Sequence, residues 1–263
     1  SALCFFTTYF NEGASYGTLN SARAALGLIG RTSLGEDACI SRFFKGVHNL
    51  RPPAPRYSST WDPATVLNHL CSIPSTDHTS IRELTLKLVT LIALVTAHRV
   101  QTLSLIQLPH ITFSESGATI NIALPIKTSR KGCPQPSLFL PFFRDKPELC
   151  VATLLQLYIR RTAAHRPPEI DRLFLTLQRP FKSASSQTLS RWIKATLKDS
   201  GINTKVFRAH SVRHAATSHA KRQGVSIDTI RATAGWSQQS AVFAQFYDRP
   251  LSSEGVFSAA VLG

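Results

Sequence analysis

A histidine and an arginine three residues apart, His210 and Arg213, form the first chemical feature of the sequence. Positions i and i+3 share one face of a helix, so the imidazole and the guanidinium would lie side by side. This pair suits a phosphate, because arginine donates two N–H groups to its oxygens and histidine can donate to it or take up a proton nearby. Alone, the motif is short enough to occur by chance on a solvated surface.

Four further residues of suitable chemistry follow a fixed order around this pair. Arg99 ends a very apolar stretch, and Lys127 ends a predicted strand. Trp236 follows a glycine, and Tyr247 lies near the end of the chain. Each has an ordinary structural alternative, because long basic side chains often extend into solvent and large aromatic ones often fill a core. The ordered set is far more specific than the His-x-x-Arg motif alone.

The chain carries a large excess of positive charge. Its 263 residues include 30 Lys and Arg against 15 Asp and Glu, a formal net charge of +15. A globular protein this basic usually binds a polyanion, and nucleic acid is the first candidate. With 43% hydrophobic and 17% charged residues, the composition excludes a disordered chain and suits one large domain or two modest ones.

Composition argues against disulfides, zinc and a membrane span. The five cysteines are an odd number without a C-x-x-C pair, so we expect neither a disulfide framework nor a tetrahedral zinc site. Free thiols suit a reducing intracellular compartment. The most apolar stretch, residues 84–97, contains Lys87 and is shorter than the ~20 residues that cross a bilayer. The start at Ser1 and the lack of methionine are typical of a fragment or a processed product.

Hydrophobic periodicity and chain-breaking residues predict a mainly helical α+β fold with one small sheet. Segments 110–113, 118–126 and 137–143 are rich in β-branched and aromatic residues and predict a three-stranded antiparallel sheet; 172–176 resembles a further short strand. The predicted helices cover residues 22–29, 37–44, 64–72, 79–99, a short piece up to Leu108, 147–161, 186–200, 209–223, 226–234 and 240–247.

A proline-rich segment, residues 51–63, divides the chain. Three prolines within five residues forbid a regular helix there, so we expect a linker. It would separate a small N-terminal helical domain, residues 1–50, from a larger body at 64–250 and a mildly apolar tail at 251–263. Two other tyrosines are poor rivals of Tyr247, because one lies in this linker and one lies within a predicted helix: Tyr57 and Tyr158.

The ordered set resembles the tyrosine recombinase (phage-integrase) family, which uses Arg, Lys, His-x-x-Arg, His or Trp, and Tyr. The block HSVRHAATSHAKRQGVSIDTIRATAGW matches the family signature along its length, and the resemblance covers about residues 60–250. Three segments, RPPAPRYSSTWDP, IKTSRKG and AGWSQQSAVFAQFYDRP, look most like recombinases of DIRS-type and Ngaro-type eukaryotic retroelements, which implies a nuclear location. One departure is that the gap from Trp236 to Tyr247 is about two residues longer than usual, which affects how the tyrosine is delivered.

The resemblance implies an enzyme that cuts and rejoins DNA strands without metal, cofactor or ATP. Tyr247 would attack the phosphate and form a 3′-phosphotyrosyl bond, which a second 5′-hydroxyl then reverses. Arg99 and Arg213 would balance the negative charge that develops on the phosphate oxygens. Lys127 would protonate the leaving 5′-oxygen as the general acid.

Two further roles follow from the same resemblance. His210 would help to deprotonate the tyrosine or hold the phosphate, and Trp236 would donate its indole N–H to a phosphate oxygen. The assignment of the general acid is open among neighbours, because hairpin register is not fixed by one sequence. The competitors for Lys127 are Arg130, Lys131 and Lys205.

Double-stranded DNA is the partner that the resemblance implies. The family clamps DNA between a core-binding domain and the catalytic domain, so residues 1–50 would be part of the first and 64–250 the second. The family also assembles as a tetramer on two duplexes with exchanged C-terminal segments, a role that the tail 251–263 could take. Predicted DNA contacts, which give affinity more than sequence choice, are Arg130, Lys131, Lys182, Arg191, Lys194, Lys205, Arg208 and His214.

Three alternatives remain beside this interpretation. A catalytically silent DNA-binding module could keep the fold, but all six positions hold chemically competent residues. A type IB topoisomerase shares the nucleophile and the two arginines, but relaxes DNA as a monomer with weak site preference. A structural basic protein, such as a ribosomal or chromatin component, would not need the ordered set.

The charge predicts how binding depends on salt. Each phosphate that a Lys or Arg neutralises releases a counterion, so the logarithm of affinity for duplex DNA should fall linearly with the logarithm of salt concentration, with a steep slope. A titration of labelled duplex at several salt concentrations measures the slope. A flat slope would count against DNA as the partner.

Overall fold

The computed structural model describes residues 1–30, 33–132, 134–237, 239–240 and 242–251. The chain divides into two compact units, Ser1–Arg56 and Tyr57–Gly263. The predicted tail, apart from Leu251, lies outside the described residues. None of the helices in the described ranges combines the length and the apolarity needed to cross a bilayer.

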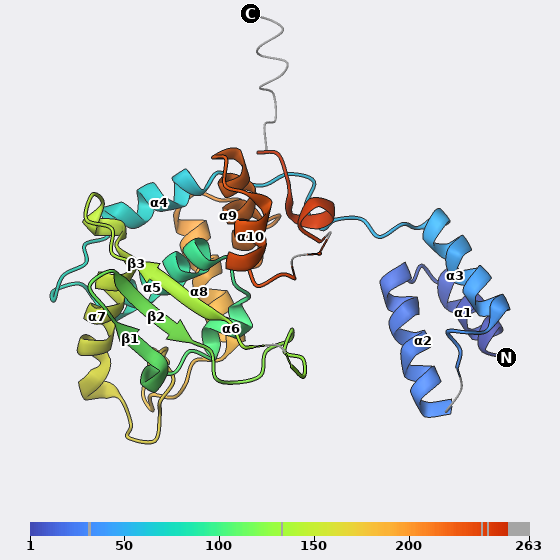
Figure 1. Ribbon diagram of the computed structural model, residues 1–263, viewed down its shortest axis with the longest axis horizontal. Helices are drawn as coiled ribbons and strands as arrows, with labels where there is room; N and C mark the ends of the chain where they lie inside the picture. The colour runs from blue at the N-terminus through green and yellow to red at the C-terminus, as the bar shows by residue number, and fades with distance from the viewer. Residues whose placement is uncertain (31–32, 133, 238, 241, 252–263) are drawn as a thin grey trace, which may run out of the picture. The chain divides into compact units, whose positions relative to one another are not determined.

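The first unit is a bundle of three helices, drawn in blue in Figure 1: α1 (Ala2–Asn11), α2 (Tyr16–Gly30) and α3 (Ala38–Leu50). Asp37 caps α3, because its carboxylate accepts the amide hydrogen of Ile40 at 2.9 Å. The three helices enclose a small core of their own, made of Phe6, Leu19, Ile40, Phe44 and Val47. The two helical pieces predicted before residue 50 fall within α2 and α3.

The second unit is built around one buried helix, α5 (Ile81–Thr96). A capping box at Ser80 and Glu83 begins it, and its side chains are buried on nearly all sides. It contacts α6, α7, α8, α9 and β3, and therefore organises the whole unit. These partners are α6 (Val100–Ser104), α7 (Val151–Thr162), α8 (Ser186–Asp199), α9 (Ser211–Arg222) and β3 (Ser137–Pro141).

The sheet has three antiparallel strands in the order β1-β2-β3, with β1 at Ile111–Phe113 and β2 at Gly117–Asn121. Ala118 pairs with Leu140, and Ile120 pairs with Leu138; all four side chains are buried. The second and third predicted strands both end earlier than expected, the third at Pro141. Pro141 pairs with Gly117 at the start of β2, and beyond it the amide of Phe142 still donates to the carbonyl oxygen of Ser116 at 3.0 Å.

Some predicted elements differ from the structure. Segment 172–176 is not a strand but forms isolated bridges, Arg172 with Gln107 and Leu175 with Ser183. The helix predicted from 147 begins at Val151, after a 3-10 turn at Pro147–Leu149. The remaining elements of the second unit are α4 (Pro63–Ser72), α10 (Ile227–Thr233), 3-10 turns at Leu108–His110 and Ala163–His165, and a π-helical turn at Phe243–Tyr247.

The proline-rich segment is only partly a linker. The boundary between the units falls at Arg56, inside the segment predicted as a linker. From Tyr57 onward the chain belongs to the second unit, where the side chains of Tyr57, Thr60 and Trp61 are buried. The prolines prevent a helix, but the aromatic residues that follow them bury enough apolar surface to fix an extended chain.

Gly117 leaves no room for a side chain. A Cβ atom there would lie 2.2 Å from the carbonyl oxygen of Leu140 and 2.8 Å from Cα of Pro141. We expect Gly117→Ala to lower the free energy of unfolding of the second unit by about 1–3 kcal/mol. Tryptophan fluorescence during urea unfolding measures this, because Trp61, Trp192 and Trp236 all lie in that unit.

A matched control is Gly46→Ala in α3, where an added Cβ meets nothing within 4 Å. Gly46 lies in the first unit and alanine favours a helix over glycine, so this variant should leave the fluorescence midpoint of the second unit unchanged and should not lower the helical circular-dichroism signal. An unchanged midpoint for Gly117→Ala would show that β2 and β3 can separate without cost.

Candidate active site

Tyr247 closes the π-helical turn Phe243–Tyr247, and its side chain is 9% exposed. The amide of Asp248 donates to the carbonyl oxygen of Phe243, five residues back, at 2.9 Å. A π-turn holds more residues per turn than an α-helix and is frequent at functional sites. The π-turn therefore accommodates extra residues of the lengthened segment between Trp236 and Tyr247, directly before Tyr247.

The residues that follow Tyr247 form hydrogen bonds and an ion pair with α9. Ser218 Oγ donates to the carbonyl oxygen of Tyr247 at 2.6 Å and accepts the amide hydrogen of Arg249 at 3.0 Å. Lys221 forms an ion pair with Asp248. In this structure the tyrosine therefore lies in the site of its own chain.

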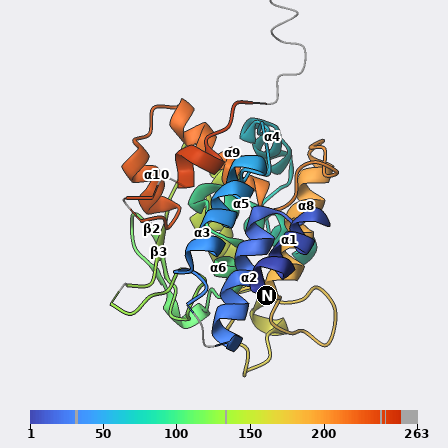
Figure 2. The same cartoon turned by 90° about the vertical axis from the view of Figure 1, so that its right-hand side faces the viewer.

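His210 lies at the N-terminal end of α9, and its Nε2 is 2.9 Å from Tyr247 Oη. This is hydrogen-bond distance, so the imidazole can take the phenolic proton or donate to the oxygen, depending on its tautomer. A phenol holds its proton at neutral pH, so a neighbouring base is what a tyrosine nucleophile requires. Figures 1 and 2 both show α9 beside α10, and Trp236 follows α10 three residues after its last residue, Thr233.

Arg213 is the buried centre of the site and is only 2% exposed. Its Nη1 donates to the carbonyl oxygens of Ala97 at 2.6 Å and Ala234 at 2.7 Å. The guanidinium carbon lies 4.0 Å from the ring centre of Trp236 and 5.4 Å from that of Tyr247. Burial, and then repulsion from Arg99, lower the pKa of Arg213 to about 10 against the opposing effect of the Tyr247 hydroxyl, so it stays a cation at neutral pH.

Three buried donor nitrogens around Tyr247 make no hydrogen bond of ordinary length to the described residues. They are Nε and Nη2 of Arg213 and Nε1 of Trp236. A buried polar group without a partner costs about 1–3 kcal/mol, and more when it is charged. Such donors suit a bound anion, and a phosphate offers several acceptor oxygens to a guanidinium and an indole at once.

Arg99 follows the end of α5 and forms the N-cap position of α6, where it is half-buried. His98, the residue before it in the chain, is buried. Burial, and then the positive charges of Arg213 and Arg99, lower the pKa of His98 to about 4, so this imidazole is neutral at physiological pH. Gly235 makes room for it: its φ is +65°, and a Cβ there would lie 2.9 Å from His98 Cε1.

Lys127 is not brought to the other five residues by any contact in the described part of the chain. It is exposed in a turn between β2 and β3. Its competitors Arg130, Lys131 and Lys205 are exposed as well. The other predicted DNA contacts that lie on the surface are Lys182, Arg191, Lys194 and Arg208.

His214, predicted among the DNA contacts, is buried and only 3% exposed. Its place suits a structural role or a neighbour of the phosphate. Its ring stacks on that of Tyr247, with centroids 4.1 Å apart and an angle of 18° between the planes. Tyr57, which lies in the segment predicted as a linker, packs near the site. Its ring meets that of His214 edge-on, with 5.0 Å between the centroids. The sequence held one indication that this segment packs against the second unit. Trp61 directly precedes Asp62, the N-cap of α4, which is the position of the first residue of a hydrophobic staple.

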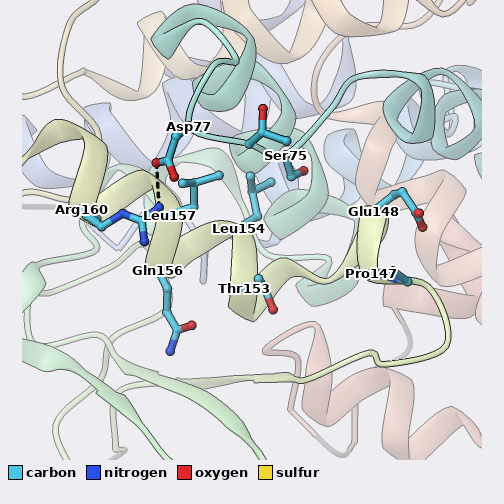
Figure 3. Close-up of a pocket in the computed structure, with 10 residues that line it drawn as sticks. Ser75, Asp77, Pro147, Glu148, Thr153, Leu154, Gln156, Leu157 and Arg160 are labelled. Atoms are coloured by element: carbon cyan, nitrogen blue, oxygen red, sulfur yellow. Dashed lines mark hydrogen bonds and ion pairs between the residues drawn. The ribbon is translucent and has the colours of Figure 1, made fainter.

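A separate hollow lies away from these residues, between the loop before α5 and α7 (Figure 3). Asp77 and Arg160 form an ion pair at its edge, with 2.7 Å between Oδ1 and Nη2. None of the six residues of the ordered set lines it. Its lining residues include Ser75, Glu148, Thr153, Gln156 and Leu157.

His98 makes stability depend on pH. Its pKa falls from an ordinary 6.5 to about 4 in the folded state, so between these values the unfolded chain binds a proton that the folded chain does not. The free energy of unfolding should therefore fall as pH decreases from 6.5 to 4, with about 3 kcal/mol from this residue. Urea unfolding at several pH values measures this. His98→Gln should show a weaker pH dependence than the wild type; equal dependence would contradict the assignment.

Comparison with known proteins identifies the family and the fold. Residues 64–253 match the phage integrase family. The structure resembles the XerH site-specific recombinase bound to palindromic difH substrate, with 15% identity, 100% of this chain and 70% of that chain covered, and a TM-score of 0.63. It resembles the Tn1549 transposon integrase in complex with transposon right end DNA, with 15% identity, 99% and 82% covered, and a TM-score of 0.64.

A lambda integrase tetramer bound to a Holliday junction is similar too, with 16% identity, 96% of this chain and 65% of that chain covered, and a TM-score of 0.54. At these identities the likeness shows the fold. No curated protein matches the sequence. The family match spans most of the chain and contains the whole ordered set from Arg99 to Tyr247, and the mainly helical unit with its small antiparallel sheet is the tyrosine recombinase catalytic fold: the chain belongs to the phage integrase family.

Proposed function

We propose that this protein is a site-specific DNA recombinase that cuts and rejoins strands through a 3′-phosphotyrosyl intermediate. One observation carries the proposal. The Tyr247 hydroxyl is hydrogen-bonded to His210 and lies beside a buried cation, Arg213, whose remaining N–H groups make no hydrogen bond of ordinary length to the described residues. A nucleophile, a base and donors awaiting an oxyanion are what phosphoryl transfer needs.

The proposed step is an exchange of one phosphoester for another. Tyr247 Oη bonds to phosphorus, its proton passes to His210, and the bond from phosphorus to the 5′-oxygen breaks. Arg99, Arg213 and Trp236 stabilise the charge that develops on the non-bridging oxygens. Attack by a second 5′-hydroxyl reverses the step, so no external energy source is consumed.

Protonation of the leaving 5′-oxygen is assigned to Lys127. Its place in an exposed turn between β2 and β3 means that the side chain has to move toward the site when DNA is bound. Arg130 and Lys131 in the same loop, and Lys205, are the alternatives. A flexible donor suits this role, because the acid is needed only when the leaving oxygen is in place.

Double-stranded DNA is the proposed partner, held by exposed basic residues of the loops and of α8. The net charge of +15 supports this, as does the description of the XerH, Tn1549 and lambda structures as DNA complexes. The lambda integrase tetramer on a Holliday junction supports self-association. Exchange of the tail 251–263 between protomers is part of the proposal and follows from the resemblance alone.

The biological setting is proposed from sequence. Residues 51–63, 126–132 and 234–250 resemble recombinases of DIRS-type and Ngaro-type retroelements, so we propose that the protein serves a mobile element and acts in the nucleus. Residues 1–50 would supply part of the DNA clamp. Among the similar structures, the Tn1549 protein is a transposon integrase.

Covalent trapping tests the proposal. Wild type and Tyr247→Phe are incubated in EDTA with nicked duplexes from the element's own ends, where loss of a short strand makes cleavage irreversible. We expect an SDS-resistant adduct with the wild type only, and equal DNA affinity for both, because the variant lacks just the attacking oxygen. The adduct is detected by a gel shift after denaturation.

Two results would overturn the assignment. An adduct with Tyr247→Phe would mean a different nucleophile. Loss of cleavage in EDTA, restored by Mg²⁺, would mean that the arginines do not supply the positive charge. Tight, salt-sensitive binding without any adduct would favour the silent DNA-binding module, and relaxation of plasmids by the monomer would favour a topoisomerase.

A further inference from the structure

Residues 57–61, here called the strap, contact the surroundings of the nucleophile at three points. They precede the segment that matches the family, residues 64–253. We propose that the strap positions Tyr247 for attack, with Tyr57 acting through His214 and Trp61 acting through Ser211. The inference rests on the proposed function, because it concerns how the tyrosine is held for cleavage.

Tyr57 supports the ring against which the nucleophile stacks. Its ring meets the ring of His214 edge-on, 5.0 Å between centroids at 87°, and His214 in turn stacks on Tyr247 at 4.1 Å. Its own position is fixed twice, since its hydroxyl accepts the amide hydrogen of Arg208 at 3.4 Å and its ring packs on Phe207 at 5.6 Å. Edge-on and stacked rings favour one orientation, so Tyr57 restricts the plane of Tyr247 through His214.

Trp61 fixes the start of the helix that carries the base. Its Nε1 donates to Ser211 Oγ at 2.9 Å, and both side chains are buried. Ser211 is the first residue of α9, directly after His210. A buried hydrogen bond between side chains 150 residues apart holds the helix start against the strap, and with it the imidazole that faces Tyr247.

Thr60 holds the chain that leaves the nucleophile. Its amide donates to the carbonyl oxygen of Pro250 at 2.8 Å, and Thr60 and Leu251 form a parallel bridge. The strap thus reaches the stacked ring, the base and the chain exit of the same tyrosine. Attack requires the oxygen to be placed within a fraction of an ångström, and a misplacement of about 1 Å can cost on the order of 10²-fold in rate.

The test measures adduct formation and DNA affinity separately, on the full chain with the nicked duplexes described above. For Tyr57→Leu we expect adduct formation slower by on the order of 10- to 100-fold in a single turnover, with affinity within about twofold of wild type. Trp61→Phe, which removes the indole N–H group together with part of the buried ring system, should slow it by about three- to tenfold. Tyr57→Phe keeps the ring and should restore nearly the wild-type rate.

Tyr158 offers a matched control for a purely structural role. Its hydroxyl also accepts an amide hydrogen at 3.4 Å, from Leu175, and its ring packs on Phe174 at 5.8 Å. It is fully buried, so Tyr158→Leu should lower the urea midpoint but leave the rate of the folded protein unchanged. Equal slowing by Tyr57→Leu and Tyr158→Leu would overturn the proposal.

A double-mutant cycle tests the route through His214. If Tyr57 acts through His214, Tyr57→Leu should cost nothing further in a His214→Ala background, whereas independent effects would multiply. Multiplying effects would overturn the route. Should Tyr57→Leu not fold, Trp61→Phe decides, and a wild-type rate for it would overturn the proposal. If the wild type forms no adduct, the proposed function itself is wrong. If the wild type forms the adduct and both strap variants form it at the wild-type rate, only the role of the strap is wrong.

Discussion

The buried guanidinium of Arg213 is the interaction on which the rest of the site depends. Through one nitrogen it joins the carbonyl oxygens of Ala97 and Ala234, and so links the end of α5 to the end of α10. A buried charge is costly unless it is paired, and its described partners here are carbonyl oxygens and aromatic rings. The arrangement fixes the cation and leaves its other N–H groups for a ligand.

The neighbouring residues can be read as consequences of that link. Ala97 takes a left-handed conformation, φ +49°, which ends α5 and turns the chain toward Arg99. His98 stays neutral beside two arginines because it is buried, and Gly235 lacks the side chain that would collide with it. The ends of α5 and α10 are therefore joined at Arg213, and Trp236 packs against its guanidinium.

Fixed and movable parts of the site divide by chemistry. The groups that stabilise charge and orient the nucleophile lie on helix ends or are buried, which favours preorganisation. The proposed acid, Lys127, lies in an exposed turn. The strap adds a third class of residue, since Tyr57 contacts His214 and Trp61 bonds to Ser211, each adjacent in sequence to a residue of the ordered set. The unpaired donors of Arg213 and Trp236 lower the free energy of unfolding, and a bound anion would offset that cost.

The sequence alone determined the residue types, their order, the charge, and most helices, because periodicity and caps such as Ser80 and Asp62 act locally. It also showed the lengthened gap before Tyr247, but not the π-helical turn there. The tertiary structure decided which side chains are buried: His214 stacks on Tyr247, and Tyr57, in the segment predicted as a linker, is buried in the second unit. The prolines of residues 51–63 restrict the local backbone conformation, which a sequence pattern can show. The burial of Tyr57 and Trp61 depends on contacts with residues some 150 positions away, which no local pattern encodes.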